Sequence, residues 1–299
     1  MPSPALIAVD WGTSALRGAL LAADGSVLAE HAAPRGLLHL PPGGWEAAFE
    51  AEFGAWLSAH PGLLCLMSGM VGGRQGWAEA AYCPCPASLD DLASRLLWLR
   101  PDRLAIVPGL SCQPDGQPDV MRGEETQVFG ALRLLGLDQA TLVLPGTHSK
   151  WVHVQGGRIT GFATHMTGEC FALLRQQSIL ARTLPADDDA PWVPEAFDDG
   201  VARAQQPGGL LHHLFSVRSL ALFDRREGAA LLSYLSGLVI GEELRAQALP
   251  VGQLPLIVGS AALTQRYQRA LALLSHPARG VGAEAGWVGL AALAARLQE

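Results

Sequence analysis

The sequence predicts an α/β fold made of two similar domains that face each other across a cleft. Short apolar segments alternate with amphipathic ones, as they do in α/β proteins. One module also occurs twice: an apolar strand, a Gly-Thr turn, a second apolar strand, a glycine-containing hairpin and a third strand. Its copies are IAVDWGTSALRGALLAADGSVLAE (residues 7–30) and ATLVLPGTHSKWVHVQGGRITGFATH (residues 140–165). A repeat at this separation favours duplicated domains over a chance likeness of two strand-turn-strand pieces.

Composition limits the class of protein. The 299 residues are 49% hydrophobic and 16% charged, which is typical of one large or two ordinary globular domains. The formal net charge is −7, and the 21 Lys and Arg residues form no basic run. This argues against a nucleic-acid partner or an anionic membrane surface, while a small anionic substrate needs only a few local cations.

The cysteines indicate a reducing compartment. Five scattered cysteines favour the cytoplasm over a disulfide framework. The run Cys83-Pro84-Cys85-Pro86 has poor zinc spacing and reads as an extended segment. The N-terminal MPSPALIAVD shows no signal-peptide pattern, and the apolar stretch from Gly228 to Gly241 is too short to span a bilayer.

The first domain is expected to cover residues 1–120. Its elements follow from apolar periodicity and from glycine, proline and Asp-Gly turn signals. The expected strands are Ala5–Val9, Leu16–Ala22 (closed by Asp24-Gly25), Leu63–Met67 and Leu104–Val107, and the expected helices are Trp45–His60 and Leu89–Leu99.

The second domain is expected to cover residues 121–299. It opens with a glycine-led helix in MRGEETQVFGALRLLG, continues with the second copy of the module, and is mainly helical after that. The expected helices are residues 201–206, 210–222 and 227–249, one ending near 274 and one starting at 283, with a strand at 254–258. LPADDDAPWVPEAFDDG is expected to be an acidic surface loop whose aspartates are solvated.

The turn in the first module has the residue types of a phosphate loop. Asp10 ends an apolar strand, where a carboxylate must face solvent or a divalent cation. Gly12 lets the backbone approach a ligand, and Thr13 and Ser14 add hydroxyl and N–H donors suited to phosphate oxygens. Taken alone, this pattern fits a plain hairpin loop equally well.

The second copy strengthens the phosphate interpretation. In LPGTHSKW, Thr147, His148 and Ser149 are donors and Lys150 is a cation. Two donor turns opposed across a cleft can hold a polyphosphate from both sides, with Mg²⁺ on Asp10 offsetting the charge. We interpret His148 as a structural donor.

Together the segments DWGTSALR, SGMVGGRQGW, MRGEETQ, PGTHSKW and MTGE resemble the 2-dehydro-3-deoxygalactonokinase family of the actin/hexokinase/Hsp70 ATPase superfamily. The resemblance runs from Ile7 to about Leu293. It implies the actin-like (ribonuclease H-like) fold, with a cleft between duplicated domains. It also implies transfer of the ATP γ-phosphate, with Mg²⁺, to the C6 hydroxyl of 2-dehydro-3-deoxy-D-galactonate in the De Ley–Doudoroff route of galactonate catabolism.

The resemblance also implies nucleotide contacts. Asp10 would position Mg²⁺ and the attacked phosphate. IVGSAAL (residues 257–263) follows a strand and opens a helix, as the adenosine segment of the superfamily does, although a generic strand-to-helix turn explains it nearly as well. The residues implied to hold the nucleotide are Gly12, Thr13, Ser14, Gly146, Thr147, His148, Lys150, Gly259 and Ser260.

RGEETQVFG stands where related carbohydrate kinases place their catalytic base. Glu124 is the candidate and Glu125 the alternative, since adjacent helix residues point in different directions. Both could instead be favourable charges at a helix N-terminus. The second loop has Leu144-Pro145 where many relatives carry an aspartate, which leaves a two-carboxylate metal site in doubt.

The sugar-acid carboxylate needs a cation or several N–H donors. Arg122 and Arg74 are the best-placed cations, with Arg17 and Lys150 as alternatives closer to the phosphates. Trp77 fits either a substrate contact or the core, and Thr167 and Glu169 fit either substrate hydroxyls or a helix cap. The full set of candidate substrate residues is Gly69, Met70, Gly72, Gly73, Arg74, Trp77, Arg122, Thr167 and Glu169.

Two other functions stay open. A kinase for another sugar acid or a neutral sugar would carry the same motifs. An actin- or Hsp70-like nucleotide switch is the second alternative, but the chain has no long insertion for a partner, and its glycine-rich loop suits a small ligand. A homodimer is the default expectation for a metabolic enzyme.

Overall fold

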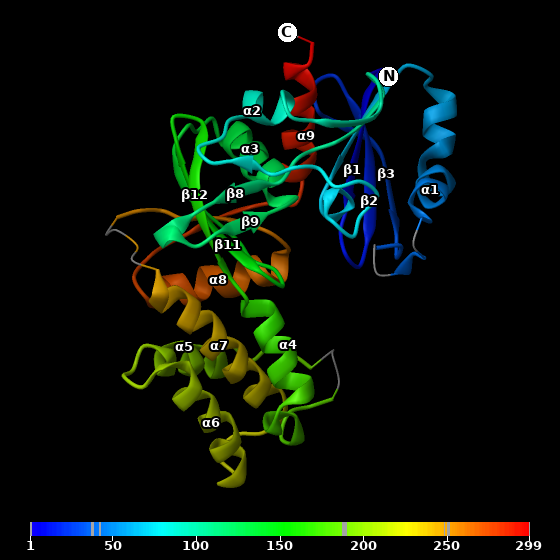
Figure 1. Ribbon diagram of the computed structural model, residues 1–299. Coiled ribbons are helices and arrows are strands. Elements are labelled where there is room, and N and C mark those ends of the chain that lie inside the picture. Colours follow the sequence, from blue (N-terminus) through cyan, green and yellow to red (C-terminus); the bar gives the residue numbers. More distant parts are fainter. Residues whose placement is uncertain are drawn as a thin grey trace. The chain divides into compact units, whose positions relative to one another are not determined.

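The computed structural model describes residues 2–36, 39–41, 43–186, 190–247, 249 and 252–298 (Figure 1). Its contacts group the chain into two compact units. Unit 1 consists of residues 1–142, 151–163 and 281–299, and unit 2 of residues 143–150 and 164–280. This grouping differs from a division at residue 120, because residues 121–142 and 151–163 and the C-terminal helix also belong to unit 1. The division into functional halves at residue 120 stays a prediction.

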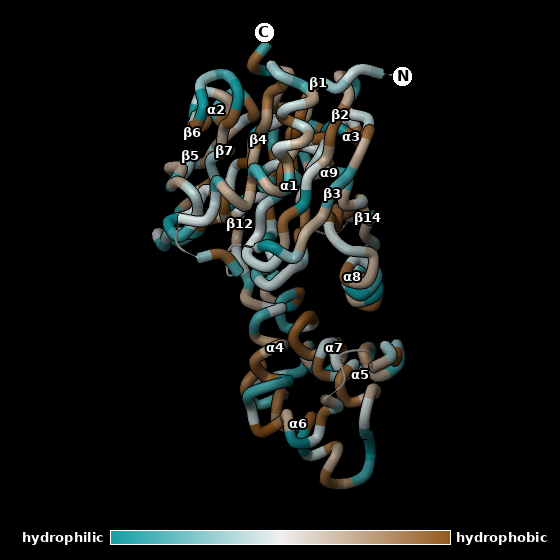
Figure 2. The backbone as a smooth tube through the Cα atoms, turned by 90° about the vertical axis from the view of Figure 1, so that its right-hand side faces the viewer, coloured by the Kyte–Doolittle hydropathy of each residue, from teal (hydrophilic) through white to brown (hydrophobic). Residues whose placement is uncertain are grey.

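Unit 1 contains a six-stranded sheet with the order β3-β2-β1-β4-β7-β6. β1 pairs antiparallel with β2 and parallel with β4, and β7 continues the parallel part. Residues of β4 and β7 are predominantly hydrophobic (Figure 2), as buried parallel strands are. The strands are β1 (Pro4–Trp11), β2 (Leu16–Ala22), β3 (Val27–Ala33), β4 (Leu64–Ser68), β6 (Leu97–Arg100) and β7 (Leu104–Ile106).

The two faces of this sheet carry different helices. Because side chains alternate along a strand, Ile7, Val9 and Trp11 of β1 share one face. They form a buried core with Phe49 and Phe53 of α1 (Trp45–Ala59). The opposite face carries α9 (Ala285–Arg296), against which α3 (Glu124–Leu135) packs.

Small residues let α3 and α9 approach closely. A Cβ at Gly130 would lie 1.7 Å from the Ala285 carbonyl oxygen, and one at Gly289 would lie 1.8 Å from that of Thr126. Glycine is therefore required at both contacts, and this packing fixes the start of α3. The other strands and α-helix described in the first 123 residues are β5 (Cys83–Pro84), α2 (Leu89–Ala93), β8 (Leu110–Cys112) and β9 (Asp119–Met121), of which the strands form a sheet ordered β5-β8-β9.

A second large sheet has the order β12-β11-β10-β13-β14. Its first three strands repeat the β3-β2-β1 arrangement, as the duplicated module predicts. The strands are β10 (Ala140–Leu144), β11 (Ser149–Gln155), β12 (Arg158–His165), β13 (Leu256–Val258) and β14 (Arg279–Val281).

The helices of unit 2 surround α7, which is apolar on nearly every side and largely buried. It crosses α5 closely, since a Cβ at Gly237 would lie 2.0 Å from the Phe197 carbonyl oxygen. None of the described helices is long and apolar enough to cross a membrane. The helices are α4 (Thr167–Gln177), α5 (Pro194–Ala204), α6 (Gly209–Leu222), α7 (Gly228–Ala246) and α8 (Ala261–Leu273).

Two local predictions need correction, and a third is confirmed. The helix expected over Leu89–Leu99 ends at Ala93, because Leu97–Arg100 pairs with β7 as β6. The expected acidic loop is partly helical, since α5 starts at Pro194, and Asp187–Asp189 lie outside the described residues. All five cysteines are free thiols, as their spacing predicts.

Candidate active site

Asp10 lies at the carboxyl end of β1, where it pairs in register with Ser68 of β4. Strand alternation places both side chains on the face of the sheet that carries α9. The Asp10 carboxylate accepts a hydrogen bond from the Arg17 guanidinium, and this ion pair is partly exposed.

Two glycines bring the start of α3 to this edge. Gly69 and Gly123 have φ values of 96° and 108°, which favour glycine. A Cβ at Gly69 would lie 2.8 Å from the Trp11 carbonyl oxygen and 3.2 Å from Asp10 Oδ1, and one at Gly123 would lie 3.2 Å from the Gly69 Cα. The backbone leading into Glu124 therefore stacks on the loop that touches Asp10.

The two adjacent glutamates have different surroundings. Glu125 is fully buried: its Oε2 accepts from the Gly123 N–H at 2.7 Å, and its Oε1 lies 3.4 Å from the Ser68 hydroxyl. Glu124 is partly exposed, and its Oε2 accepts from the Arg122 N–H at 3.0 Å. Burial and, second, the Glu124 charge raise the pKa of Glu125 from 4.5 to about 8, against the opposing effects of nearby N–H groups and Arg122. Glu125 is thus mostly protonated at neutral pH.

Replacing Glu125 with glutamine is expected to stabilise the protein at alkaline pH. The folded state holds this proton more tightly than the unfolded chain, so the wild type loses stability as pH rises from about 4.5 through 8, by on the order of a few kcal/mol. Glutamine resembles the protonated glutamic acid side chain but does not titrate, so the variant should not lose this stability as pH rises. Urea unfolding at pH 5, 7 and 9 should show the variant's advantage growing with pH, and parallel curves would contradict the raised pKa.

The turn of the first module, which the sequence predicts to be a phosphate loop, is tight: the Gly12 N–H donates to the Ala15 carbonyl oxygen at 3.0 Å. Thr13 and Ser14 are exposed. Gly36 supports the turn from behind, since a Cβ there would lie 2.3 Å from the Thr13 carbonyl oxygen. The sequence offered no signal for this contact.

In the glycine-rich loop, the Gly72 and Gly73 N–H groups donate to the carbonyls of Gly69 and Met70, so both donors are engaged within the loop. Arg74 is largely exposed and lies 3.4 Å from Glu79. Trp77 packs its ring 6.4 Å from that of Trp11 and 5.5 Å from that of Phe49, which gives it a place in the core.

Arg122 is 8% exposed, and its guanidinium lies 4.4 Å from the centre of the Tyr82 ring. Its Nη2 donates to the Ala80 carbonyl oxygen at 2.8 Å, whereas its buried Nε and Nη1 have no hydrogen-bond partner among the residues described. A Cβ at Gly72 would lie 2.9 Å from Nη1. The glycine-rich loop therefore covers this cation.

Unit 2 holds the second loop, in which Gly146, Thr147 and His148 are exposed. The start of α4 supports this loop. His148 Nε2 lies 2.5 Å from Glu169 Oε2, and the Glu169 N–H donates to the Thr147 carbonyl oxygen at 2.9 Å. A Cβ at Gly168 would lie 2.3 Å from the Gly146 carbonyl oxygen, so only glycine fits there.

Glu243 of α7 joins these elements and was not found from the sequence. It is 3% exposed and accepts hydrogen bonds from Ser149 Oγ at 2.8 Å, from Tyr267 OH at 2.6 Å and from Thr167 Oγ1. Its only sequence signal is a carboxylate at the end of an apolar helix.

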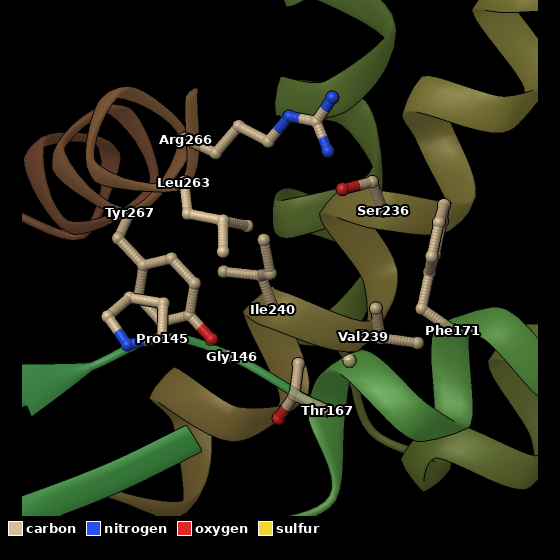
Figure 3. A pocket seen from close by; sticks show the side chains of 11 residues that line it. Pro145, Gly146, Thr167, Phe171, Ser236, Val239, Ile240, Leu263, Arg266 and Tyr267 are labelled. Atoms are coloured by element: carbon tan, nitrogen blue, oxygen red, sulfur yellow. The ribbon is translucent and has the colours of Figure 1, made fainter. Parts of the chain in front are cut away.

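A pocket of about 60 Å³ lies beside the second loop (Figure 3). Gly259 lies next to this loop, since a Cβ added at Gly259 would lie 3.6 Å from Pro145 Cδ. Ser260 caps α8, because its hydroxyl accepts a hydrogen bond from the Leu263 N–H at 3.4 Å. The pocket is lined by Pro145, Gly146, Thr167, Gly168, Phe171, Ser236, Val239, Ile240, Leu263, Arg266 and Tyr267.

Unit 1 and unit 2 each bring together part of the predicted set. In unit 1, Asp10, Gly69 and the residues around Glu124 converge. In unit 2, Glu169, which the sequence assigned to the substrate, contacts Thr147 and His148, which it assigned to the nucleotide. Thr167 lines the same pocket as Gly146. Lys150 is buried in β11, where its Nζ donates to Thr164 Oγ1 at 2.8 Å.

The chain matches the family model described as 2-keto-3-deoxy-galactonokinase over residues 10–293. It belongs to this family. A Rhizobium meliloti (strain 1021) protein named "Probable 2-dehydro-3-deoxygalactonokinase DgoK1" is 38% identical over 96% of this chain and 95% of its own. The 2-dehydro-3-deoxygalactonokinase of Escherichia coli (strain K12) is 34% identical over 88% of each chain.

Solved structures agree with this family and its fold. A crystal structure of a Sinorhizobium meliloti protein assigned to the same kinase has a TM-score of 0.89 and 37% identity, covering 98% of this chain and 99% of its own. The ADPNP-bound 2-hydroxyisocaproyl-CoA dehydratase activator from Clostridium difficile has a TM-score of 0.54 at 15% identity and covers 98% of this chain and 94% of its own. The fold is therefore that of the actin-like ATPases, and the chain is a sugar-acid kinase that uses ATP.

Proposed function

We propose that the protein transfers the γ-phosphate of ATP to the C6 hydroxyl of 2-dehydro-3-deoxy-D-galactonate, forming the 6-phosphate and ADP. The observation that carries this proposal is the convergence of Asp10, Gly69 and the start of α3 in a chain of this kinase family. The De Ley–Doudoroff route of galactonate catabolism would use this reaction.

Glu124 is the proposed general base. It takes the C6 hydroxyl proton while the oxygen bonds to the γ-phosphorus and the bond to the β,γ-bridging oxygen breaks, releasing ADP. Its partly exposed position lets a hydroxyl reach it, whereas Glu125 is buried and mostly protonated at neutral pH. The Glu125 carboxyl group accepts a hydrogen bond from the Gly123 N–H. This bond fixes the backbone just before Glu124 and so positions the Glu124 side chain.

Asp10 is the proposed Mg²⁺ ligand. No group of three or more His, Cys, Asp or Glu side chains that could hold a metal occurs in the described part of the chain. One carboxylate fits Mg²⁺ nonetheless, because this ion is commonly held by one or two carboxylates, water and substrate phosphates. When bound, Mg²⁺ would offset the charge that develops on the phosphates.

The nucleotide contacts are proposed in each unit separately. In unit 1, the exposed Thr13 and Ser14 offer donors to phosphate oxygens, and Gly12, whose own N–H is engaged within the turn, lets the backbone approach them. In unit 2, the exposed Gly146, Thr147 and His148 do the same, with Glu169 orienting the His148 ring. Gly259 and Ser260 border the same loop and would lie near the nucleoside.

Arg74 is the proposed cation for the substrate carboxylate. It is exposed and weakly paired, whereas the guanidinium of Arg122 is covered by the glycine-rich loop and serves to position that loop. Gly69 and Met70 remain candidates for hydroxyl contacts. A homodimer is proposed as the assembly, and light scattering would test it.

The test is ADP formation with Mg-ATP and a panel of 2-keto-3-deoxy sugar acids and neutral sugars. We expect ADP release that depends on 2-dehydro-3-deoxygalactonate. Faster turnover with another acceptor would change the substrate, and ADP release that needs no acceptor would favour a nucleotide switch.

A further inference from the structure

Arg266 is a cation without a partner in the pocket of unit 2. It lies on α8, six residues after Ser260, and forms no hydrogen bond or ion pair with any described residue. Burial lowers its pKa, and no neighbouring charge is among the causes. Figure 3 shows its guanidinium extending from α8 toward α7, on the side where Ser236 lies.

An unpaired, partly buried guanidinium is costly unless a ligand supplies acceptors. Arg269 on the same helix is different, because its guanidinium donates two hydrogen bonds to the Asp198 carboxylate, at 2.5 and 2.6 Å. Arg266 has no such carboxylate beside it. Its side chain therefore indicates a binding site for a ligand rather than a structural ion pair.

The chemistry of the pocket limits what that molecule can be. Its walls are mostly apolar, from Phe171, Val239, Ile240 and Leu263. The Tyr267 and Thr167 hydroxyls already donate to Glu243, whereas no described residue is hydrogen-bonded to the Ser236 hydroxyl. Apolar walls with one planar donor and one hydroxyl suit a flat heteroaromatic ring that carries nitrogen or oxygen acceptors on its edge.

The position of the pocket identifies this ring. Pro145 and Gly146 of the second loop form one side of it. A nucleotide whose phosphates lie at that loop would have its base within reach of this pocket. We propose that Arg266 contacts the base of the bound nucleotide and makes the affinity of this kinase for its phosphate donor depend on that base. This inference rests on the proposed function in placing the phosphates at the second loop.

The test is calorimetric binding of ADP and of pyrophosphate, which has no base, to the wild type and to Arg266→Met. We expect the dissociation constant for ADP to rise about tenfold, the effect of one lost charge-assisted contact, while pyrophosphate binding stays unchanged. Arg266→Lys keeps the charge but not the planar donor pair, so it should restore little ADP affinity. The melting temperature without ligand should not fall in Arg266→Met, because no protein contact is lost.

Gln265→Ala, an exposed position outside the pocket on the same helix, is the control and should bind both ligands as the wild type does. Equal weakening of ADP and pyrophosphate would overturn the inference by making Arg266 a phosphate contact, as would full rescue by lysine. Unchanged ADP binding in Arg266→Met would overturn it while the proposed function stands. If the wild type bound neither ligand, the proposed nucleotide site itself would be wrong.

Discussion

Replacing Glu124 with glutamine is expected to lower kcat by about a hundredfold to ten-thousandfold, the usual contribution of a general base. The KM values for ATP and the sugar acid should change little. Glutamine keeps the size of the side chain and can still accept the Arg122 N–H, so the start of α3 should stay in place. What it cannot do is take the proton of the C6 hydroxyl. Steady-state kinetics at pH 7 would measure the loss.

Glu125→Gln is the matched comparison, one residue away on the same helix. Since Glu125 is mostly protonated at neutral pH, its amide copy should reduce kcat by less than about tenfold, an effect of positioning rather than proton transfer. If Glu125→Gln showed the larger loss of kcat, Glu125 would be the base and its raised pKa would belong to the mechanism. Equal and small losses would mean that neither carboxylate accepts the proton.

Features that depend on neighbouring residues could be predicted from the sequence. The β1-β2-β3 module and its copy follow from apolar alternation and Gly-containing turns, and Asp10 lies at a strand end as the pattern predicts. The α2 prediction failed because the apolar residues Leu97 and Leu99 satisfy a helical period, whereas pairing with β7 decides their structure. Tertiary contact overrides local periodicity in such short segments.

Features that depend on distant residues could not be predicted. Ser149, Glu243 and Tyr267 meet only through the packing of α7 and α8 on the second loop, and no local pattern marks them. The glycine in MTGE is a similar case: the motif is visible, but the 2.3 Å approach of Gly168 to the Gly146 carbonyl is not.

Replacing Asp10 with asparagine is expected to lower kcat at least about a hundredfold, because a metal-held charge contributes several kcal/mol to the transition state and each 1.4 kcal/mol is about tenfold. Asparagine can still accept a hydrogen bond from Arg17, so β1 and β2 should keep their pairing. The loss should persist at saturating Mg²⁺, and the melting temperature should stay near that of the wild type. A variant with unimpaired kcat would remove Asp10 from the mechanism.

Arg17→Gln distinguishes two possible roles of Arg17, an ion-pair partner of Asp10 or a ligand of the ATP phosphates. If Arg17 only pairs with Asp10, its removal leaves the carboxylate more attractive to a cation, since a neighbouring positive charge disfavours cation binding. The Mg²⁺ concentration for half-maximal rate should then fall while KM for ATP is unchanged. A rise in KM for ATP would instead make Arg17 a phosphate ligand. Asp10→Asn should raise the Mg²⁺ requirement under either role, so opposite shifts in the two variants would identify Asp10 as the metal-binding member of the pair.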